Sequence, residues 1–197
     1  MSSTKWSIKN NFYVAVVGVP GVGKTTICKK VSKKINLPYI NYGDLMLEIA
    51  KRKKLAGDDK ELFSLDIDTQ RKIWEEAAIR IRKIDAAMID LHGVDQSPIG
   101  YIISLPINYI VPKLIILVES EPGQILLQRK TDTKMRIKDT LKTLKEHINI
   151  LRISMIICSS MLGSKLYILK NIKLEESVKE MAWVIEKEKD IYEKCKM

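Results

Sequence analysis

The sequence has few of the residues that mark a metal-binding, disulfide-bonded or membrane-spanning protein. Its 197 residues include three cysteines, Cys28, Cys158 and Cys195, and two histidines, His92 and His147. An odd number of cysteines without metal-ligand or redox spacing indicates free thiols in a reducing compartment, and the isolated histidines disfavour a zinc site. No apolar run approaches the length of a membrane-spanning helix, and the start of the chain lacks the apolar region of a signal peptide. We therefore expect a cytoplasmic protein that does not bind membranes.

Aromatic residues are also scarce, at 6%, whereas the formal net charge is +10. This charge has two interpretations: a basic patch that binds nucleic acid, or a lysine-rich surface on an enzyme with polyanionic substrates. The lysines are interleaved with acidic residues along the chain, and there is no aromatic ladder on which bases could stack. We therefore favour the enzyme and expect no nucleic-acid partner. The 46% of apolar residues are ample for the core of one globular domain.

Residues 18–26 match the pattern G-x-x-x-x-G-K-[ST] of a phosphate-binding loop, between a strand-like apolar run and a helix-like apolar stripe. In order, the loop reads Gly18, Val19, Pro20, Gly21, Val22, Gly23, Lys24, Thr25 and Thr26. Backbone N–H groups of such a loop wrap an anion, and glycine is needed because a Cβ would obstruct the dihedrals and the close approach. We predict that this loop binds a nucleoside triphosphate, that Lys24 reaches its β- and γ-phosphates, and that Thr25 binds Mg²⁺.

Strand-like and helix-like patterns alternate along the rest of the chain. We expect strands near residues 12–17, 37–41, 86–90, 114–118 and 166–169, and helices near residues 23–36, 44–50, 68–83, 121–130, 137–162 and 174–189. Asp44 is the expected N-cap of the second of these helices. The alternation predicts an α/β fold, in which a five-stranded parallel sheet is covered by helices on both faces.

Asp90 ends the third expected strand. A carboxylate at the carboxyl end of a central strand can hold Mg²⁺, directly or through water, beside a phosphate loop. We therefore predict that Asp90 binds the metal together with Thr25; an ordinary cap at the end of a strand is the alternative. Residues 91–104 are expected to form a loop at the same edge of the sheet, where substrates are contacted.

The expected helix over residues 137–162 has more apolar residues than one packed face requires. Ile150, Ile153, Ile156 and Ile157 widen a stripe that already recurs at alternating steps of four and three. This surplus has two explanations that the sequence leaves open: a fully buried helix, or an interface between subunits.

Only seven arginines are available for phosphoryl transfer, which requires positioned cations around the moving group. Arg129 ends the helix after the fourth strand, Arg136 lies in a basic connector, and Arg152 lies on the long helix that follows. We predict that these three arginines close over the transferred group, as in the lid of a small-molecule kinase. A guanine-reading [NT]-K-x-D segment is absent from the sequence, which disfavours a switch GTPase.

Together these stretches resemble the archaeal-type adenylate kinases, which are P-loop nucleoside monophosphate (NMP) kinases. The ordered set over about residues 12–188 comprises residues 18–26, residues 41–46, residues 89–92, residues 97–101, Leu105, Pro106, Arg129, Asp132, Arg136 and Arg152. The resemblance implies a three-layer fold with a small helical NMP-binding segment at about residues 43–84 and a short lid at about residues 129–137.

The resemblance also implies the reaction ATP + AMP ⇌ 2 ADP with Mg²⁺, which serves adenine nucleotide homeostasis. The AMP-binding residues that it implies are Tyr42, Gly43, Asp44, Gln96 and Tyr101. It further implies a cytoplasmic location and a homo-oligomer, commonly a homotrimer, which would fit the surplus apolar face of the long helix.

Three positions depart from the family pattern. Phe63 lies where the family usually has a basic pair, Gln96 replaces a basic residue, and Lys134 replaces the first arginine of the lid. Lysine keeps the charge but loses the bidentate geometry of arginine, whereas glutamine and phenylalanine lose the charge. Two alternatives therefore stand beside adenylate kinase: a kinase for another nucleoside monophosphate, and a weakly active nucleotide-binding paralogue that acts through a partner.

Overall fold

The computed structural model describes residues 11–97, 99–131 and 140–195. At its centre lies a five-stranded parallel sheet with the strand order β2-β3-β1-β6-β7. The strands are β1 (Phe12–Val17), β2 (Tyr39–Asn41), β3 (Ala86–Asp90), β6 (Leu114–Glu119) and β7 (Lys165–Lys170). All six residues of β1 are buried, as expected for the central strand of a sheet that is covered on both faces. The predicted five-stranded parallel sheet is confirmed.

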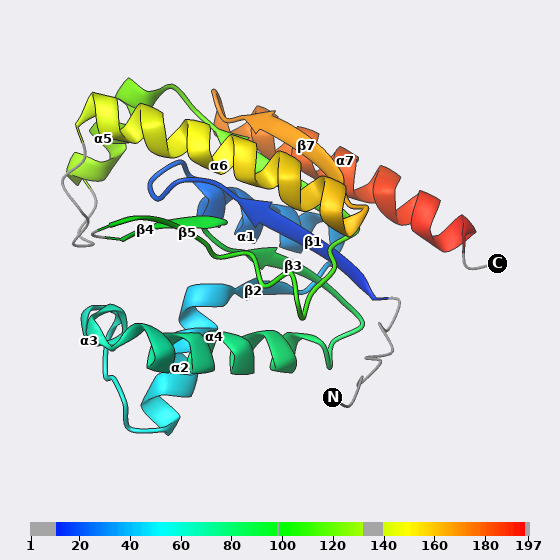
Figure 1. The fold of residues 1–197 in the computed structure, drawn as a ribbon. Coiled ribbons are helices and arrows are strands. Elements are labelled where there is room, and N and C mark those ends of the chain that lie inside the picture. Colours follow the sequence, from blue (N-terminus) through cyan, green and yellow to red (C-terminus); the bar gives the residue numbers. More distant parts are fainter. Residues whose placement is uncertain (1–10, 98, 132–139, 196–197) are drawn as a thin grey trace.

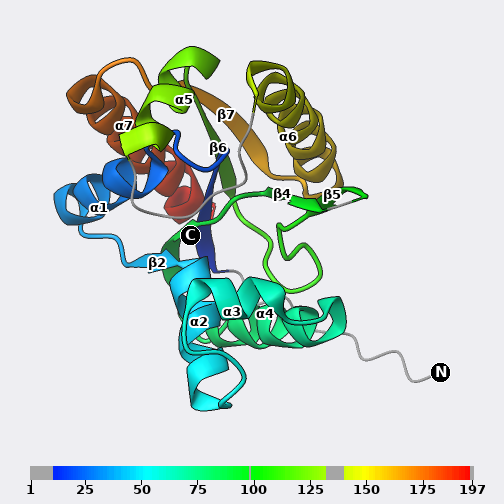
Figure 2. The ribbon, with the colours of Figure 1, turned by 90° about the vertical axis from the view of Figure 1, so that its left-hand side faces the viewer.

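Helices form a layer on each face of this sheet (Figures 1 and 2). On one face, α1 (Lys24–Ile35) packs beside α7 (Leu174–Lys194), and α6 (Leu141–Leu162) covers the other. The short helix α5 (Pro122–Thr131) follows β6 and contacts α6. A separate helical group, α2 (Tyr42–Arg52), α3 (Asp59–Ser64) and α4 (Ile67–Ile81), follows β2 and lies beyond the β2 edge of the sheet.

Two local expectations were wrong. Residues 91–104, expected as a loop, contain an antiparallel hairpin of β4 (Val94–Ser97) and β5 (Gly100–Ile103). The hairpin is held against α6, because His147 Nε2 donates a hydrogen bond to the Val94 carbonyl oxygen at 3.0 Å. Helix α2 is capped by Asn41 instead of Asp44: the Asn41 side chain accepts a hydrogen bond from the backbone N–H of Asp44 at 3.1 Å, so the helix begins at Tyr42.

The apolar residues of helix α6 are only partly buried. Leu144, Leu151 and Met155 are buried against the sheet. The side chains of Ile153 and Ile156 are instead 56% and 51% exposed. A fully buried helix is therefore wrong as the explanation for these isoleucines, and the subunit interface stays a prediction. In the part of the chain that the structure describes, no helix combines the length and apolar character needed to cross a membrane.

Candidate active site

The candidate site lies at the carboxyl ends of the parallel strands. β1 lies between β3 and β6, so the loop that follows β1 is at the centre of this edge, where the strand order reverses and ligands of open α/β sheets bind. Polar residues at the ends of the neighbouring strands surround it: Asn41 ends β2, Asp90 ends β3, Glu119 ends β6 and Asn171 follows β7. The sheet therefore brings together side chains that are far apart in the sequence.

The phosphate loop, residues 18–23, has the backbone that its glycines permit. Gly21 and Gly23 have φ angles of 87° and 91°, which L side chains rarely adopt. A Cβ on Gly18 would lie 2.7 Å from the carbonyl oxygen of Val118, so this position requires glycine because β6 is so close. No side chain caps α1, whose N-cap is Gly23. The backbone amides of the first turn and the positive end of the helix dipole can therefore bind a phosphate.

Two predicted cations lie against this loop. Lys24 is buried, and its Nζ donates a hydrogen bond across the loop to the Gly18 carbonyl oxygen at 2.7 Å. Arg129, near the end of α5, donates from Nε to the Pro20 carbonyl oxygen at 2.8 Å. The structure thus brings together the loop, the P-loop lysine and one of the three predicted arginines. Arg136, with most of the predicted lid, lies outside the described residues.

Thr25 and Asp90 also meet as predicted. The Thr25 hydroxyl donates a hydrogen bond to Asp90 Oδ2 at 2.7 Å, and Asp90 is nearly fully buried. One hydroxyl and one carboxylate suit Mg²⁺, which takes oxygen ligands and keeps several waters alongside one or two carboxylates and substrate phosphates. Residues 11–97, 99–131 and 140–195 contain no cluster of three or more His, Cys, Asp or Glu side chains that could hold a metal.

Arg152, the remaining described arginine of the predicted set, is paired away from the loop backbone. Its Nε and Nη2 donate to the two carboxylate oxygens of Glu119, each at 2.8 Å. This pairing raises the pKa of the Arg152 guanidinium above its usual value. Sequence reasoning missed Glu119, although the signal was the one used for Asp90: an acidic residue that ends a buried strand. The bidentate pair joins α6 to the end of β6, one strand from the phosphate loop.

Asn171 is a second residue that sequence reasoning missed. Its side-chain amide donates to the Val22 carbonyl oxygen at 2.9 Å, and its Oδ1 accepts from the hydroxyl of Ser177 on α7 at 3.0 Å. The amide also lies directly over Gly23, where a Cβ would be 2.7 Å from Asn171 Nδ2. Asn171 therefore holds the phosphate loop against the end of β7.

The predicted AMP-binding residues fall into two groups. Tyr42, Gly43 and Asp44 form the first turn of α2, where Tyr42 is buried and its hydroxyl donates to the carbonyl oxygen of Trp74 at 2.6 Å. Gln96 and Tyr101 are direct partners across the β4–β5 hairpin. The Tyr101 hydroxyl donates to Glu146 of α6 at 3.2 Å.

Phe63, one of the departures from the family pattern, lies on α3 with 55% of its surface exposed. The side chain therefore contributes little to the core of the helical group α2–α4. An exposed apolar ring at this position supplies no positive charge for a phosphate.

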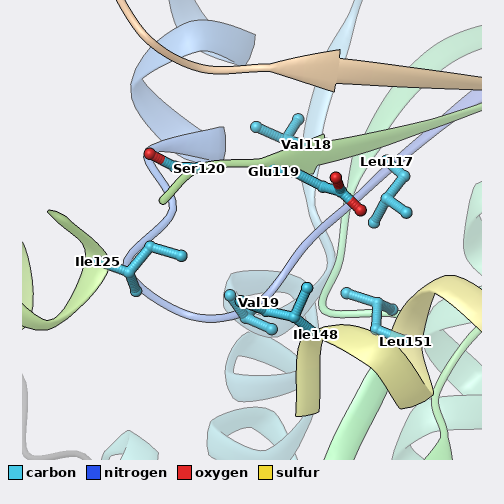
Figure 3. A pocket seen from close by; sticks show the side chains of 8 residues that line it. All are labelled: Val19, Leu117, Val118, Glu119, Ser120, Ile125, Ile148 and Leu151. Atoms are coloured by element: carbon cyan, nitrogen blue, oxygen red, sulfur yellow. The ribbon is translucent and has the colours of Figure 1, made fainter. Parts of the chain in front are cut away.

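A small apolar cavity lies behind the loop, between the end of β6 and helix α6 (Figure 3). Its volume of about 10 Å³ corresponds to about one water molecule, so it cannot hold a nucleotide. It is lined by Val19, Leu117, Val118, Glu119, Ser120, Ile125, Ile148 and Leu151. The buried Val19 thus packs the loop against residues of β6, α5 and α6.

Proteins of similar sequence are adenylate kinases and an adenylate kinase homolog. A family model described as an AAA domain matches residues 17–145. An adenylate kinase homolog from Methanothermobacter thermautotrophicus is 49% identical over 173 residues, which make up 88% of this chain and 92% of that protein. The adenylate kinase of Methanopyrus kandleri is 33% identical over 181 residues, covering 86% of this chain and 95% of that protein.

Solved structures show the fold. A shikimate kinase from Aquifex aeolicus superposes with a TM-score of 0.59 at 21% identity, covering 89% of this chain and 96% of that one. A gluconokinase from Sinorhizobium meliloti gives a TM-score of 0.58 at 14% identity, covering 93% and 97% of the two chains. At these identities the likeness concerns the fold alone, and it confirms the predicted three-layer P-loop kinase architecture.

Proposed function

Since this chain belongs to the adenylate kinase family and is a nucleoside monophosphate kinase, we propose that ATP is its donor and AMP its acceptor. The binding of ATP, the donor half of the proposal, is supported mainly by one observation. The Thr25 hydroxyl donates a 2.7 Å hydrogen bond to Asp90 beside the phosphate loop and the buried Lys24. The acceptor is inferred from the family. Free cysteines, two buried and one exposed, are consistent with a cytoplasmic location, which we also propose.

The chemistry follows from positioning and electrostatics, without a covalent intermediate. The loop amides and Lys24 hold the β- and γ-phosphates, and Arg129 holds the loop through Pro20. Thr25 and Asp90 would hold Mg²⁺, which would supply positive charge to offset the negative charge of the phosphates. The acceptor phosphate oxygen then displaces ADP from the γ-phosphorus in line, and the positive groups offset the negative charge of the transferred group.

On the acceptor side we propose that AMP binds near the first turn of α2 and the β4–β5 hairpin. Arg136 and Arg152 would stabilise the transferred group, in which case Arg152 leaves the Glu119 carboxylate when the substrates bind. The guanidinium of Arg152 suits such an exchange, because it can bind two oxygens of a carboxylate or two oxygens of a phosphate in a bidentate manner.

We further propose that copies of the chain associate through α6, as a homo-oligomer and in the family's form a homotrimer. The supporting observation is that Ile153, Ile156, Ile157 and Met161 are all more than half exposed on this helix. A cluster of apolar side chains on one exposed face is typical of an interaction surface.

The test is a phosphotransfer assay with a nucleotide panel. Purified protein with ATP, AMP and Mg²⁺ should form ADP, and Lys24→Ala should abolish this reaction. Lys30→Ala is a matched control, because Lys30 lies on the same helix but pairs with Glu175 on the outer surface. Much faster phosphorylation of CMP, UMP or a deoxynucleotide would show that AMP is the wrong acceptor.

A second candidate is favoured by the departures at Phe63 and Gln96, which remove positive charge from the acceptor side. It is a nucleotide-binding paralogue that acts through a partner. Tight ATP binding without phosphoryl transfer to any monophosphate would support it over the kinase.

A further inference from the structure

Tyr39 lies on the short strand β2, next to β3 in the sheet. Its hydroxyl donates a hydrogen bond to Asp90 Oδ2 at 3.0 Å. The Thr25 hydroxyl donates to the same oxygen at 2.7 Å. Neither hydrogen bond uses Asp90 Oδ1. A single oxygen of the carboxylate therefore accepts both hydrogen bonds. One comes from Thr25 on helix α1 and the other from Tyr39 on the neighbouring strand β2.

Tyr39 is itself held in place. Asn41 Nδ2 donates to the Tyr39 hydroxyl oxygen at 3.4 Å, while Asn41 Oδ1 accepts from the Asp44 backbone at the start of α2. The Tyr39 hydroxyl thus accepts one hydrogen bond from Asn41 and donates the other to the Asp90 carboxylate.

The carboxylate of aspartate rotates easily about its last torsion, where the preferred wells are broad. To bind a metal or a metal-bound water, one carboxylate oxygen must stay in a fixed position. Hydrogen bonds to the carboxylate from residues that do not themselves bind the metal can fix it. Thr25 alone cannot fix it, because its hydroxyl is the other predicted ligand and must itself be oriented. Tyr39 contributes a second donor, which comes from a different element, the strand β2.

We propose that Tyr39 is a positioning residue for MgATP binding: its hydroxyl fixes Asp90 through Oδ2 and so keeps Oδ1 available to Mg²⁺ or its water. This inference rests on the donor half of the proposed function and is independent of which monophosphate is the acceptor. The competing explanation is that the hydrogen bond only stabilises the short edge strand β2.

The experiment compares Tyr39→Phe with the wild type by calorimetric titration of a non-hydrolysable ATP analogue, once with Mg²⁺ and once with EDTA. Loss of an outer partner of a metal ligand typically costs tenfold or more, so the analogue should bind Tyr39→Phe about tenfold more weakly with Mg²⁺. Binding in EDTA should be unchanged, which also shows that the variant is folded. An equal loss in both buffers, or no loss, would overturn the proposal.

Tyr167→Phe is the matched control. Its hydroxyl also donates to a carboxylate, that of Glu180 at 2.6 Å, but it joins β7 to the outer helix α7. This variant should bind the analogue like the wild type under both conditions.

A double-mutant cycle tests whether Tyr39 acts through Asp90. In an Asp90→Asn background, Tyr39→Phe should no longer weaken binding in Mg²⁺, because the group that it positions has been replaced. A full tenfold loss in that background would show that Tyr39 acts by another route. If the wild type binds MgATP but phosphorylates no AMP, the proposed activity fails while the result for Tyr39 still stands.

Discussion

Replacement of Asn171 by alanine should loosen the phosphate loop and lower the stability of the whole domain. The change removes the 2.9 Å hydrogen bond to the Val22 carbonyl oxygen and the 3.0 Å hydrogen bond from the Ser177 hydroxyl. It keeps the backbone hydrogen bond from Asn171 N to the Glu119 carbonyl oxygen, 2.7 Å long, so β7 should still end in the same place. The substitution should therefore remove only the two side-chain hydrogen bonds of Asn171, to Val22 and from Ser177, which we call the Asn171 clamp.

The magnitude follows from which groups lose their partner. The lost hydrogen bond to the Val22 carbonyl oxygen contributes a net of about 1 kcal/mol, and leaving the buried Ser177 hydroxyl without its acceptor costs about 1–3 kcal/mol in all. Ser177 is only 1% exposed, whereas Gly23 and Asn171 are only partly buried. We therefore expect Asn171→Ala to lower the free energy of unfolding by about 2–4 kcal/mol. The less ordered loop should bind ATP about fivefold more weakly, equivalent to about 1 kcal/mol.

The assay is urea unfolding followed by far-UV circular dichroism, together with titration of ATP. Ser177→Ala and the double variant complete a cycle, and the double variant should lose less than the sum of the single variants, because no hydroxyl is left without its acceptor. Ordinary surface substitutions change the free energy of unfolding by less than about 0.5 kcal/mol. If Asn171→Ala lowers it by no more than that and ATP affinity is unchanged, the proposed role of the Asn171 clamp is refuted.

Three further predictions test the catalytic, electrostatic and assembly arguments. Arg152→Ala should lower kcat on the order of a thousandfold while leaving ATP binding intact, and a near-normal kcat in a steady-state assay would exclude Arg152 from the transfer step. Glu76→Gln should cost up to about 1 kcal/mol of unfolding free energy at neutral pH, because hydrogen bonding from Lys53, the largest cause, lowers the pKa of Glu76 below its ordinary 4.5. That stability is present above pH 4.5 and is lost as pH falls through the lower folded pKa. The free energies of unfolding of the wild type and the variant should therefore become equal in acid. A difference in stability that persists at pH 2 would contradict this explanation. Ile156→Lys should reduce the mass measured by light scattering if α6 is the subunit interface, and an unchanged oligomer would place the interface elsewhere.

The residues of the proposed donor site could be placed from the sequence because their positions depend on a contiguous motif and on one general property of parallel sheets. A polar residue at the carboxyl end of a buried strand must lie at the same edge as the phosphate loop, and this placed Asp90 beside Thr25. The same argument, applied to the ends of β6 and β7, would have found Glu119 and Asn171. Those two were missed because no motif pointed to them.

Other features were not accessible from the sequence. The Arg152–Glu119 pair depends on where α6 crosses the sheet, which no local pattern encodes. Tyr39 has the ordinary composition of a strand residue, since aromatic side chains are enriched in strands, and only the register with β3 brings its hydroxyl to Asp90. The β4–β5 hairpin was missed because its strands are four residues each and partly polar, so alternation over so short a span carries little signal.

The difference between the two halves of the site has a physical origin. The donor half is built on the ends of adjacent strands, whose spacing is fixed by backbone hydrogen bonds, so its geometry survives substitutions elsewhere. The acceptor half is proposed to lie at the first turn of α2 and the short β4–β5 hairpin, and its cations would come from side chains. Replacing basic residues by Phe63 and Gln96 therefore removes charge from the acceptor half without altering the phosphate loop. ATP affinity should thus be insensitive to restoring a basic residue at these positions, whereas the KM for the monophosphate should fall.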